Sequence, residues 1–217
     1  MALVQGHRVL TGVRTQPAPQ ETKFKRAKRV GIYGGTFNPI HNAHLLIAEQ
    51  VYANLCLDRV DFMPDAIPPH VDRKEAVAAD LRLQMLELAI KNNPHFRIEK
   101  AELNRGGVSY TYDTMKQLIE QHPDTDYYFI IGGDMVDYLP TWHRIDELVR
   151  LPRFHFVAVR RQGAQNMTKY PVIWIDVPTV AFSSTDIRRR VQQGTTIRYM
   201  VPQAVADFIK EHQLYHD

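Results

Sequence analysis

Residues 29–44 read RVGIYGGTFNPIHNAH. The apolar run Arg29–Tyr33 is typical of a short buried strand, and it leads directly into Gly34 and Gly35. Glycines let the backbone approach a phosphate closely, and a helix starting near His41 would add free N–H groups and a positive dipole end. The stretch therefore predicts a strand, a phosphate-binding turn and a helix in succession. It is not the dinucleotide-binding fingerprint, which requires a third glycine.

Strands and helices alternate through the rest of the chain. This alternation predicts βαβ units and an α/β fold with a doubly wound, mostly parallel sheet. In such folds ligands bind at the carboxyl ends of strands, which here means the loops after Tyr33, Met63, Ile131 and Val177. Further strands are expected at Val60–Met63, Phe96–Leu103, Tyr127–Ile131, Phe154–Val159 and Val172–Ile175, and helices at Leu81–Lys91, Tyr112–Gln121, Ser184–Gln193 and Pro202–His212.

The net charge of +3 is unevenly distributed. Residues 1–29 hold seven lysines and arginines against one glutamate, a balance of +6, so the remainder carries −3. An acidic remainder disfavours nonspecific nucleic-acid binding by the folded part. Because the first segment lacks a sustained apolar period, we expect a flexible basic extension over residues 1–28 and a single domain over 29–217. A solvated extension is favoured over nucleic-acid contact or a transit-peptide role.

Cysteine usage and hydropathy exclude several protein classes. Cys56 is the only cysteine, which excludes an intrachain disulfide framework and fits a reducing compartment. No run approaches the roughly 18 apolar residues of a membrane span, and no secretory signal is visible at the start. We therefore expect a cytoplasmic protein without membrane association.

Two histidines mark the start of the first predicted helix. His41 and His44 are three residues apart, so they lie on one helix face. Two imidazoles beside a phosphate can donate hydrogen bonds to oxygens on which negative charge builds in a transition state. The alternatives are two partly exposed histidines beside a glycine turn, or a zinc site, which lacks a third Cys or His at ligand spacing.

The loop after Val177 carries a second candidate phosphate site. Residues 182–188 read FSSTDIR, and Ser183 and Asp186 have capping-box spacing. The hydroxyls, the helix N-terminus and Arg188 could grip a second phosphate. An ordinary helix start is the simpler alternative.

The two loops together resemble the paired signatures of the nucleotidyltransferase superfamily, an opening motif of the GGTFDPxHxGH type and a closing motif of the SSTxIR type. Other segments resemble the nicotinate-nucleotide adenylyltransferase branch and follow its order. The resemblance spans residues 29–215 and implies a Rossmann-like nucleotidyltransferase fold. These segments are Met63-Pro64, Pro68-Pro69-His70, Ser109-Tyr110-Thr111, Ile130–Asp134, Leu139–Trp142 and Leu214-Tyr215.

The resemblance implies transfer of the AMP part of ATP to nicotinate mononucleotide, with release of pyrophosphate and with Mg²⁺ carried by the ATP phosphates. The attacking phosphate is already ionised near pH 7, so positioning and charge neutralisation can replace a general base. The implied partners are these two small molecules, not nucleic acid. The oligomeric state is not determined, and a homo-oligomer stays an open alternative.

The same resemblance assigns residues to three roles. His41, His44 and Arg188 would be catalytic, with the histidines on the α-phosphate and Arg188, Thr36 and Ser184 on the β- and γ-phosphates. Gly133 and Asp134 would border the adenosine ribose, and Trp142 would stack on the pyridine ring. The implied ATP-binding set is Gly34, Gly35, Thr36, Phe37, Gly133, Asp134, Ser183, Ser184 and Thr185, and the implied acceptor-binding set is Asn38, His70, Tyr110, Thr111, Trp142 and His143.

Three positions depart from the family pattern. Asn38 stands where Asp is usual, Ala43 replaces a glycine, and Val71 replaces a frequent lysine. Asn38 keeps an acceptor oxygen and Ala43 is small, so we expect the phosphate loop to survive. Val71 removes a cation from the acceptor side.

Three other functions remain to be distinguished. A phosphopantetheine transferase and a nicotinamide-preferring enzyme are alternatives within the same enzyme class. A nucleotide-binding regulatory protein could share the fold without the activity.

Overall fold

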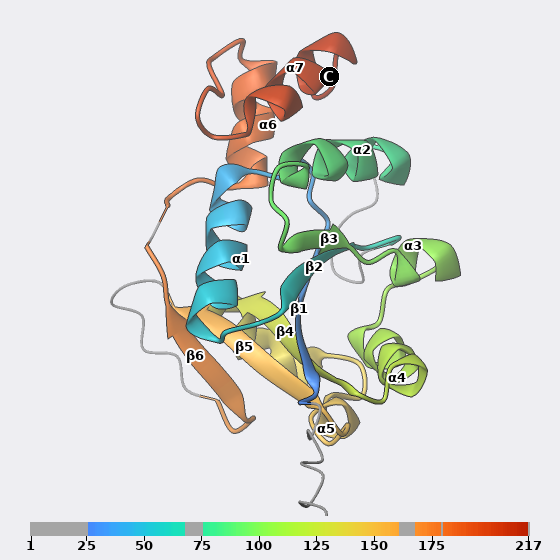
Figure 1. Cartoon of the computed structure of the whole chain (residues 1–217). Helices are drawn as coiled ribbons and strands as arrows, with labels where there is room; N and C mark the ends of the chain where they lie inside the picture. Colours follow the sequence, from blue (N-terminus) through green and yellow to red (C-terminus); the bar gives the residue numbers. More distant parts are fainter. Residues whose placement is uncertain (1–25, 68–75, 161–167, 179, 217) are drawn as a thin grey trace, which may run out of the picture.

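The computed structural model describes residues 26–67, 76–160, 168–178 and 180–216 (Figure 1). Its centre is one six-stranded sheet in the order β3-β2-β1-β4-β5-β6, and every adjacent pair is parallel. This confirms the predicted α/β, doubly wound, Rossmann-like fold. The strands are β1 (Lys28–Gly35), β2 (Arg59–Pro64), β3 (Phe96–Ile98), β4 (Thr125–Gly132), β5 (Phe154–Arg160) and β6 (Val172–Asp176).

Helices cover both faces of the sheet because successive strand residues point to opposite faces. On β1, Val30 and Ile32 pack into one core cluster, while Tyr33 packs into the other. The Tyr33 face is covered by α1 (Asn42–Asn54), α2 (Ala79–Ile90), α6 (Ser184–Gln192) and α7 (Gln203–Glu211). The opposite face is covered by α3 (Ala101–Arg105), α4 (Thr111–Gln121), the 3-10 helix η2 (Gly133–Thr141) and α5 (Ile145–Leu148).

Two predictions about elements were wrong. The expected strand Phe96–Leu103 ends at Ile98, because the chain turns at Glu99, whose carboxylate accepts from the N–H of Ala101, and α3 follows. Pro202 is the residue before α7, not its first helical residue. The 3-10 helix η2 was not predicted.

The strand order reverses between β1 and β4, which are neighbours although about a hundred residues separate them. Loops leave the carboxyl ends of these two strands in opposite directions, and such a switch point is where ligands bind in open α/β sheets. No helix in the described segments is long and apolar enough to cross a membrane.

Candidate active site

Two cavities adjoin at the switch point. The larger, about 590 Å³, opens beyond the ends of β1, β2 and β4, and the smaller, about 240 Å³, lies beside α1 and the start of α6. Tyr33 and Gly132, at the ends of the two central strands, line both cavities. A group bound in one cavity can therefore meet a group bound in the other at this edge of the sheet.

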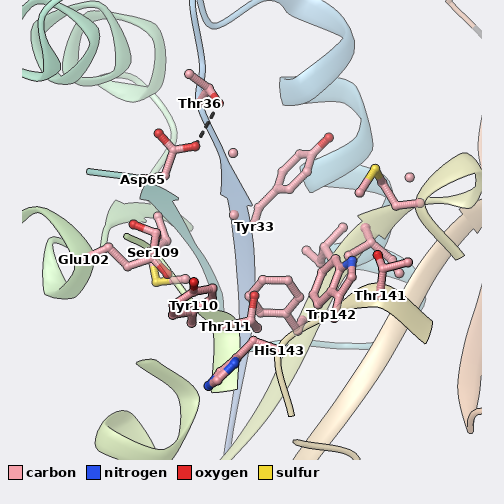
Figure 2. Close-up of a pocket in the computed structure, with 18 residues that line it drawn as sticks. Tyr33, Thr36, Asp65, Glu102, Ser109, Tyr110, Thr111, Thr141, Trp142 and His143 are labelled. Carbon is pink, nitrogen blue, oxygen red and sulfur yellow. Dashed lines mark hydrogen bonds between the residues drawn. The ribbon is translucent and has the colours of Figure 1, made fainter. Parts of the chain in front are cut away.

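Four of the six predicted acceptor residues meet in the larger cavity (Figure 2). Its wall includes Tyr110, Thr111, Trp142 and His143. Figure 2 shows Tyr33 rising between Thr36 and the group formed by Trp142, Thr111 and His143. The rings of Tyr110 and His143 lie 4.4 Å apart at their centroids, which joins the start of α4 to the end of η2.

The predicted ATP residues divide between the cavities. Asp134, Gly133, Ser183 and Ser184 line the smaller cavity together with both histidines. Gly34, Gly35 and Thr36 line the larger one instead. Phe37 and Thr185 line neither. Gly34, Gly35 and Thr36 thus border the cavity of the predicted acceptor residues, while the other predicted ATP residues that line a cavity border the smaller one.

Phe37 has a structural role in this loop. It adopts a left-handed backbone conformation with φ 48°, is 2% exposed, and packs edge-on against Tyr33, His44 and Phe62. A Cβ atom on Gly35 would lie 3.2 Å from the Phe37 ring, so a side chain at this position would require the ring to shift by a few tenths of an ångström.

His41 and His44 form a reciprocal cap at the start of α1. The N–H of His44 donates to Nδ1 of His41 at 3.4 Å, and the N–H of His41 donates to Nδ1 of His44 at 3.3 Å. The rings are stacked, with centroids 3.6 Å apart. Because Nδ1 is an acceptor in each ring, the proton of each neutral imidazole must sit on Nε2. Neither Nε2 donates to a described residue, so both remain available to a ligand in the smaller cavity.

The electrostatics of the pair favour these neutral rings. Burial lowers the pKa of His41 to about 4. Burial, followed by the charge of His41, lowers the pKa of His44 well below its usual 6.5. At neutral pH both rings are uncharged hydrogen-bond donors.

A buried ion pair holds the glycine loop against the end of β2. The Arg82 guanidinium, 2% exposed, donates to the Asp65 carboxylate at 3.1 Å and to the Thr36 carbonyl at 2.8 Å. The Thr36 hydroxyl donates to the other Asp65 oxygen at 2.8 Å, a bond drawn in Figure 2. Burial raises the pKa of Asp65, while the bonds from Thr36 and Arg82 oppose that shift. The Thr36 side chain is therefore committed to Asp65 in this structure.

A second buried carboxylate lies in the larger cavity. Glu102, 4% exposed, accepts from the Thr114 hydroxyl at 3.0 Å, and Arg105 donates to the same hydroxyl at 2.8 Å. Burial raises the pKa of Glu102, against bonds from Ser109 and Thr114. The Ser109 hydroxyl also accepts from the N–H of Ala66, which ties this wall to the end of β2.

Asp65, Arg82, Glu102 and Tyr33 are residues of the site that sequence reasoning missed. The sequence offered a signal for two of them: Tyr33 ends the predicted strand Arg29–Tyr33, and Asp65 lies two residues after the predicted strand Val60–Met63. No feature of the sequence pointed to Arg82 or Glu102, because their burial depends on partners that are distant in sequence.

The closing motif contacts the glycine loop through its side chains. Ser183 caps α6 with Asp186, as predicted from their spacing. The Ser184 hydroxyl donates to the Pro39 carbonyl at 2.9 Å, and Arg188 donates to the Asn38 carbonyl at 3.0 Å. The two phosphate-site candidates therefore lie side by side.

Two predicted acceptor residues need separate mention. Asn38 is 5% exposed and lines neither cavity; its side-chain oxygen accepts from Tyr215 at 2.9 Å. His70, like Val71, lies outside the described residues. Within the described residues, no group of three His, Cys, Asp or Glu side chains is placed to hold a metal ion.

The chain is similar to several known proteins. The cytidylyltransferase-like family profile matches residues 32–190. A relative from Lactiplantibacillus plantarum, named probable nicotinate-nucleotide adenylyltransferase, is 58% identical over 87% of this chain and 88% of its own. A protein of the same name from Enterococcus faecalis is 54% identical over 90% of this chain and 88% of its own.

Among solved structures, the fold matches the nicotinic acid mononucleotide adenylyltransferase of Plasmodium falciparum complexed with NaAD. The TM-score is 0.73 at 20% identity, covering 87% of this chain and 97% of that one. This likeness supports the fold, and the identity to the bacterial relatives supports the family. The chain belongs to the nicotinate-nucleotide adenylyltransferase family, within the cytidylyltransferase-like proteins.

Proposed function

We propose that this protein transfers AMP from ATP to nicotinate mononucleotide, forming deamido-NAD and pyrophosphate in NAD biosynthesis. The observation that carries the proposal is the junction of two cavities at Tyr33 and Gly132, with two neutral Nε2–H donors beside it. One cavity suits each substrate, and the histidines stand where the reacting phosphates would meet.

ATP would occupy the smaller cavity and nicotinate mononucleotide the larger. Asp134 and Gly133 border the smaller space and would contact the adenosine ribose. Trp142, Tyr110 and His143 provide aromatic rings around the larger space, which suits a pyridine ring. Ser184 and Arg188 contact the loop at Pro39 and Asn38 and would bind the leaving phosphates. Thr36 would contribute its backbone N–H, because its hydroxyl donates to Asp65.

The chemical step forms one bond and breaks one. A phosphate oxygen of the mononucleotide attacks the α-phosphorus of ATP, and the bond from that phosphorus to the β-phosphate oxygen breaks as pyrophosphate leaves. The attacking phosphate is already ionised, so the protein need not remove a proton. The Nε2–H groups of His41 and His44 would donate to the α-phosphate oxygens, where negative charge develops in a water-poor site.

The start of α4 suits the carboxylate of the acceptor. The first N–H groups of a helix have no intrahelical partner, and α4 has no side-chain cap at Tyr110. Tyr110 and Thr111, at this helix start, both line the larger cavity. Free N–H groups and the positive end of the helix dipole favour an anion there.

Mg²⁺ would enter with ATP. Among the carboxylates that line the two cavities, Asp65 is bound by Thr36 and Arg82, and Glu102 is bound by Thr114. The phosphates of ATP would therefore supply most of the ligands of the ion. Mg²⁺ keeps several waters and commonly binds substrate phosphates, so the ion would neutralise the departing pyrophosphate. The cytoplasmic location expected from the sequence stays a prediction.

A pyrophosphate-release assay with a panel of acceptors tests the proposal. Purified protein with Mg²⁺-ATP should release pyrophosphate with nicotinate mononucleotide, and far less with nicotinamide mononucleotide or phosphopantetheine. Release with phosphopantetheine alone would assign the chain to another transferase. ATP binding without release for any acceptor would favour the regulatory alternative.

A further inference from the structure

Residues 38–42, which join the glycine pair to α1, are held by the C-terminal part of the chain. The contacts come from α6, from the segment before α7 and from the residues after α7, which Figure 1 shows gathered above α1 and α2. Among the residues that the structure describes, these hydrogen bonds make the connection: Ser184 Oγ to Pro39 O, Arg188 Nη1 to Asn38 O, Asn42 N to Met200 O, Asn42 Nδ2 to Tyr199 O, and Tyr215 Oη to Asn38 Oδ1.

The bond from Tyr215 spans the longest sequence separation in this set. Its hydroxyl donates to Asn38 Oδ1 at 2.9 Å, across 177 residues. The N–H of Val77, just before α2, donates to the same oxygen at 3.4 Å. These two donors occupy both lone pairs of the amide oxygen. Burial raises the pKa of Tyr215, against the charges of Arg188 and Arg82, so the phenol keeps its proton at neutral pH.

We propose that Tyr215 is a positioning residue for AMP transfer: by holding the Asn38 side chain, it sets the path of residues 38–41 and so the placement of the histidine pair. The proposal rests on the function proposed above. Tyr215 lines neither of the two cavities, so its effect on a ligand bound there would be indirect.

Loss of the Tyr215 hydrogen bond should act locally, because Asn38 and the histidine pair are close in sequence. Asn38 is three residues before His41, and its carbonyl also accepts from Arg188. A change in the Asn38 backbone therefore moves a catalytic imidazole and a phosphate-binding guanidinium together. Misplacement of reacting groups by about 1 Å can cost on the order of 10²-fold in rate. For loss of one hydroxyl we expect about a tenfold decrease in kcat, with the KM for ATP changed less than about twofold.

Tyr215→Phe removes only the hydroxyl, and Tyr128→Phe is the matched control. Tyr128 is 8% exposed, and its hydroxyl accepts one bond, at 3.1 Å, from Arg29 near the opposite end of the sheet. Both variants lose one phenol hydrogen bond, so both should show a similar small decrease in Tm. Only Tyr215→Phe should lower kcat. Equal kcat values for the two variants and the wild type would overturn the proposal.

A readout independent of activity separates this inference from the proposed function. In the free protein, NMR resonances of the His41 and His44 imidazoles should shift in Tyr215→Phe and stay in place in Tyr128→Phe. Unshifted resonances would overturn the positioning role even if the wild type proved inactive on nicotinate mononucleotide. An inactive wild type with shifted resonances would instead refute only the proposed function.

A double-mutant cycle tests whether Asn38 transmits the effect. If Tyr215 acts through Asn38, the loss of kcat in Asn38→Ala should grow little when Tyr215→Phe is added, because contacting residues are not additive. Fully additive losses would show that Tyr215 acts by another route and would refute the mechanism.

Discussion

The histidine pair performs two tasks with different atoms of the same rings. Each Nδ1 accepts a backbone N–H at the start of α1, a task that serine or aspartate usually performs. This arrangement leaves each Nε2–H for a ligand and fixes the tautomer without an additional partner. The spacing of His41 and His44 predicted that they share a helix face. Their stacking and their tautomers depend on ring orientation, which spacing does not specify.

His44→Ala should lower kcat by about 10²–10³-fold, with a smaller effect on the KM for ATP, because the lost donor acts mainly on charge that develops in the transition state. His95→Ala is the control: His95 is half-buried and stacks on Tyr52, 4.3 Å between centroids, and lines neither cavity. Steady-state kinetics of both variants check the result. Wild-type turnover by His44→Ala would remove this histidine from the mechanism.

The free energy of unfolding should decrease as the pH is lowered from about 6.5 to 4, because burial lowers the folded-state pKa of His41 to about 4. Above pH 6.5 both states are neutral at this residue and the stability is fully present. Below pH 6.5 this histidine binds a proton in the unfolded chain but not in the folded protein. The free energy of unfolding therefore decreases by about 1.4 kcal/mol per pH unit for each such histidine. His41→Asn keeps a good helix cap and removes the titration, so its unfolding free energy should depend less steeply on pH. Identical slopes in urea titrations would show that His41 titrates normally.

At the scale of elements, the glycine loop is held by neighbours on both sides. Arg82 of α2 ties Thr36 to the end of β2, and α6 contacts Pro39 through Ser184. The order of strands and helices could be predicted from apolar periodicity, and so could the loops that carry the site. The end of β3 could not be predicted, since α3 forms where Glu102 accepts a hydrogen bond from the buried Thr114 hydroxyl of α4. The buried position of Arg82 could not be predicted either, because a charged residue among the apolar residues of α2 gives no sign of an ion pair.

Arg82→Met should destabilise the protein by about 3–5 kcal/mol, because it leaves the buried Asp65 carboxylate without its cation. Arg153→Met is the control: Arg153 is 41% exposed in its ion pair with Asp126, and such surface pairs contribute about 0–1 kcal/mol. Urea unfolding of both variants gives the comparison. Equal small effects would mean that Asp65 is neutral in the folded protein or is served by other groups.

At the scale of the whole molecule, the site uses nearly the full described length, from β1 to Tyr215. Removing residues 1–25 should leave Tm within a few degrees and kcat unchanged, because the basic segment lies outside the family resemblance and the sheet begins at Lys28. The shortened chain keeps the Arg26–Asp58 ion pair. Thermal unfolding and the pyrophosphate assay check this. A large decrease in either quantity would show that the first 25 residues pack on the domain or complete the site.

The protein should prefer nicotinate mononucleotide to its amide at least tenfold in kcat/KM. Backbone N–H groups at the start of α4 and near His143 suit a carboxylate, which only accepts hydrogen bonds, whereas the amide NH₂ would face donors and leave them unsatisfied. An unsatisfied buried pair costs about 1–3 kcal/mol, and the middle of that range corresponds to roughly 30-fold in kcat/KM. Because the selectivity comes from dipoles covered by the bound substrate, it should change little with salt.

Thr111→Pro sharpens the test. Proline is tolerated at the first position of a helix, and Tyr110 already has φ −87° and ψ 122°, which a following proline requires. The variant removes one N–H from the cavity wall and keeps α4. The acid preference should therefore fall several-fold, while kcat/KM for the amide changes little.

Measuring kcat/KM for both acceptors at saturating Mg²⁺-ATP, at low and high salt, tests this prediction. Equal kcat/KM values for acid and amide in the wild type would reject nicotinate as the preferred acceptor and leave the adenylyl transfer itself intact. A preference that collapses at high salt would place the selectivity in an exposed charge and not in α4.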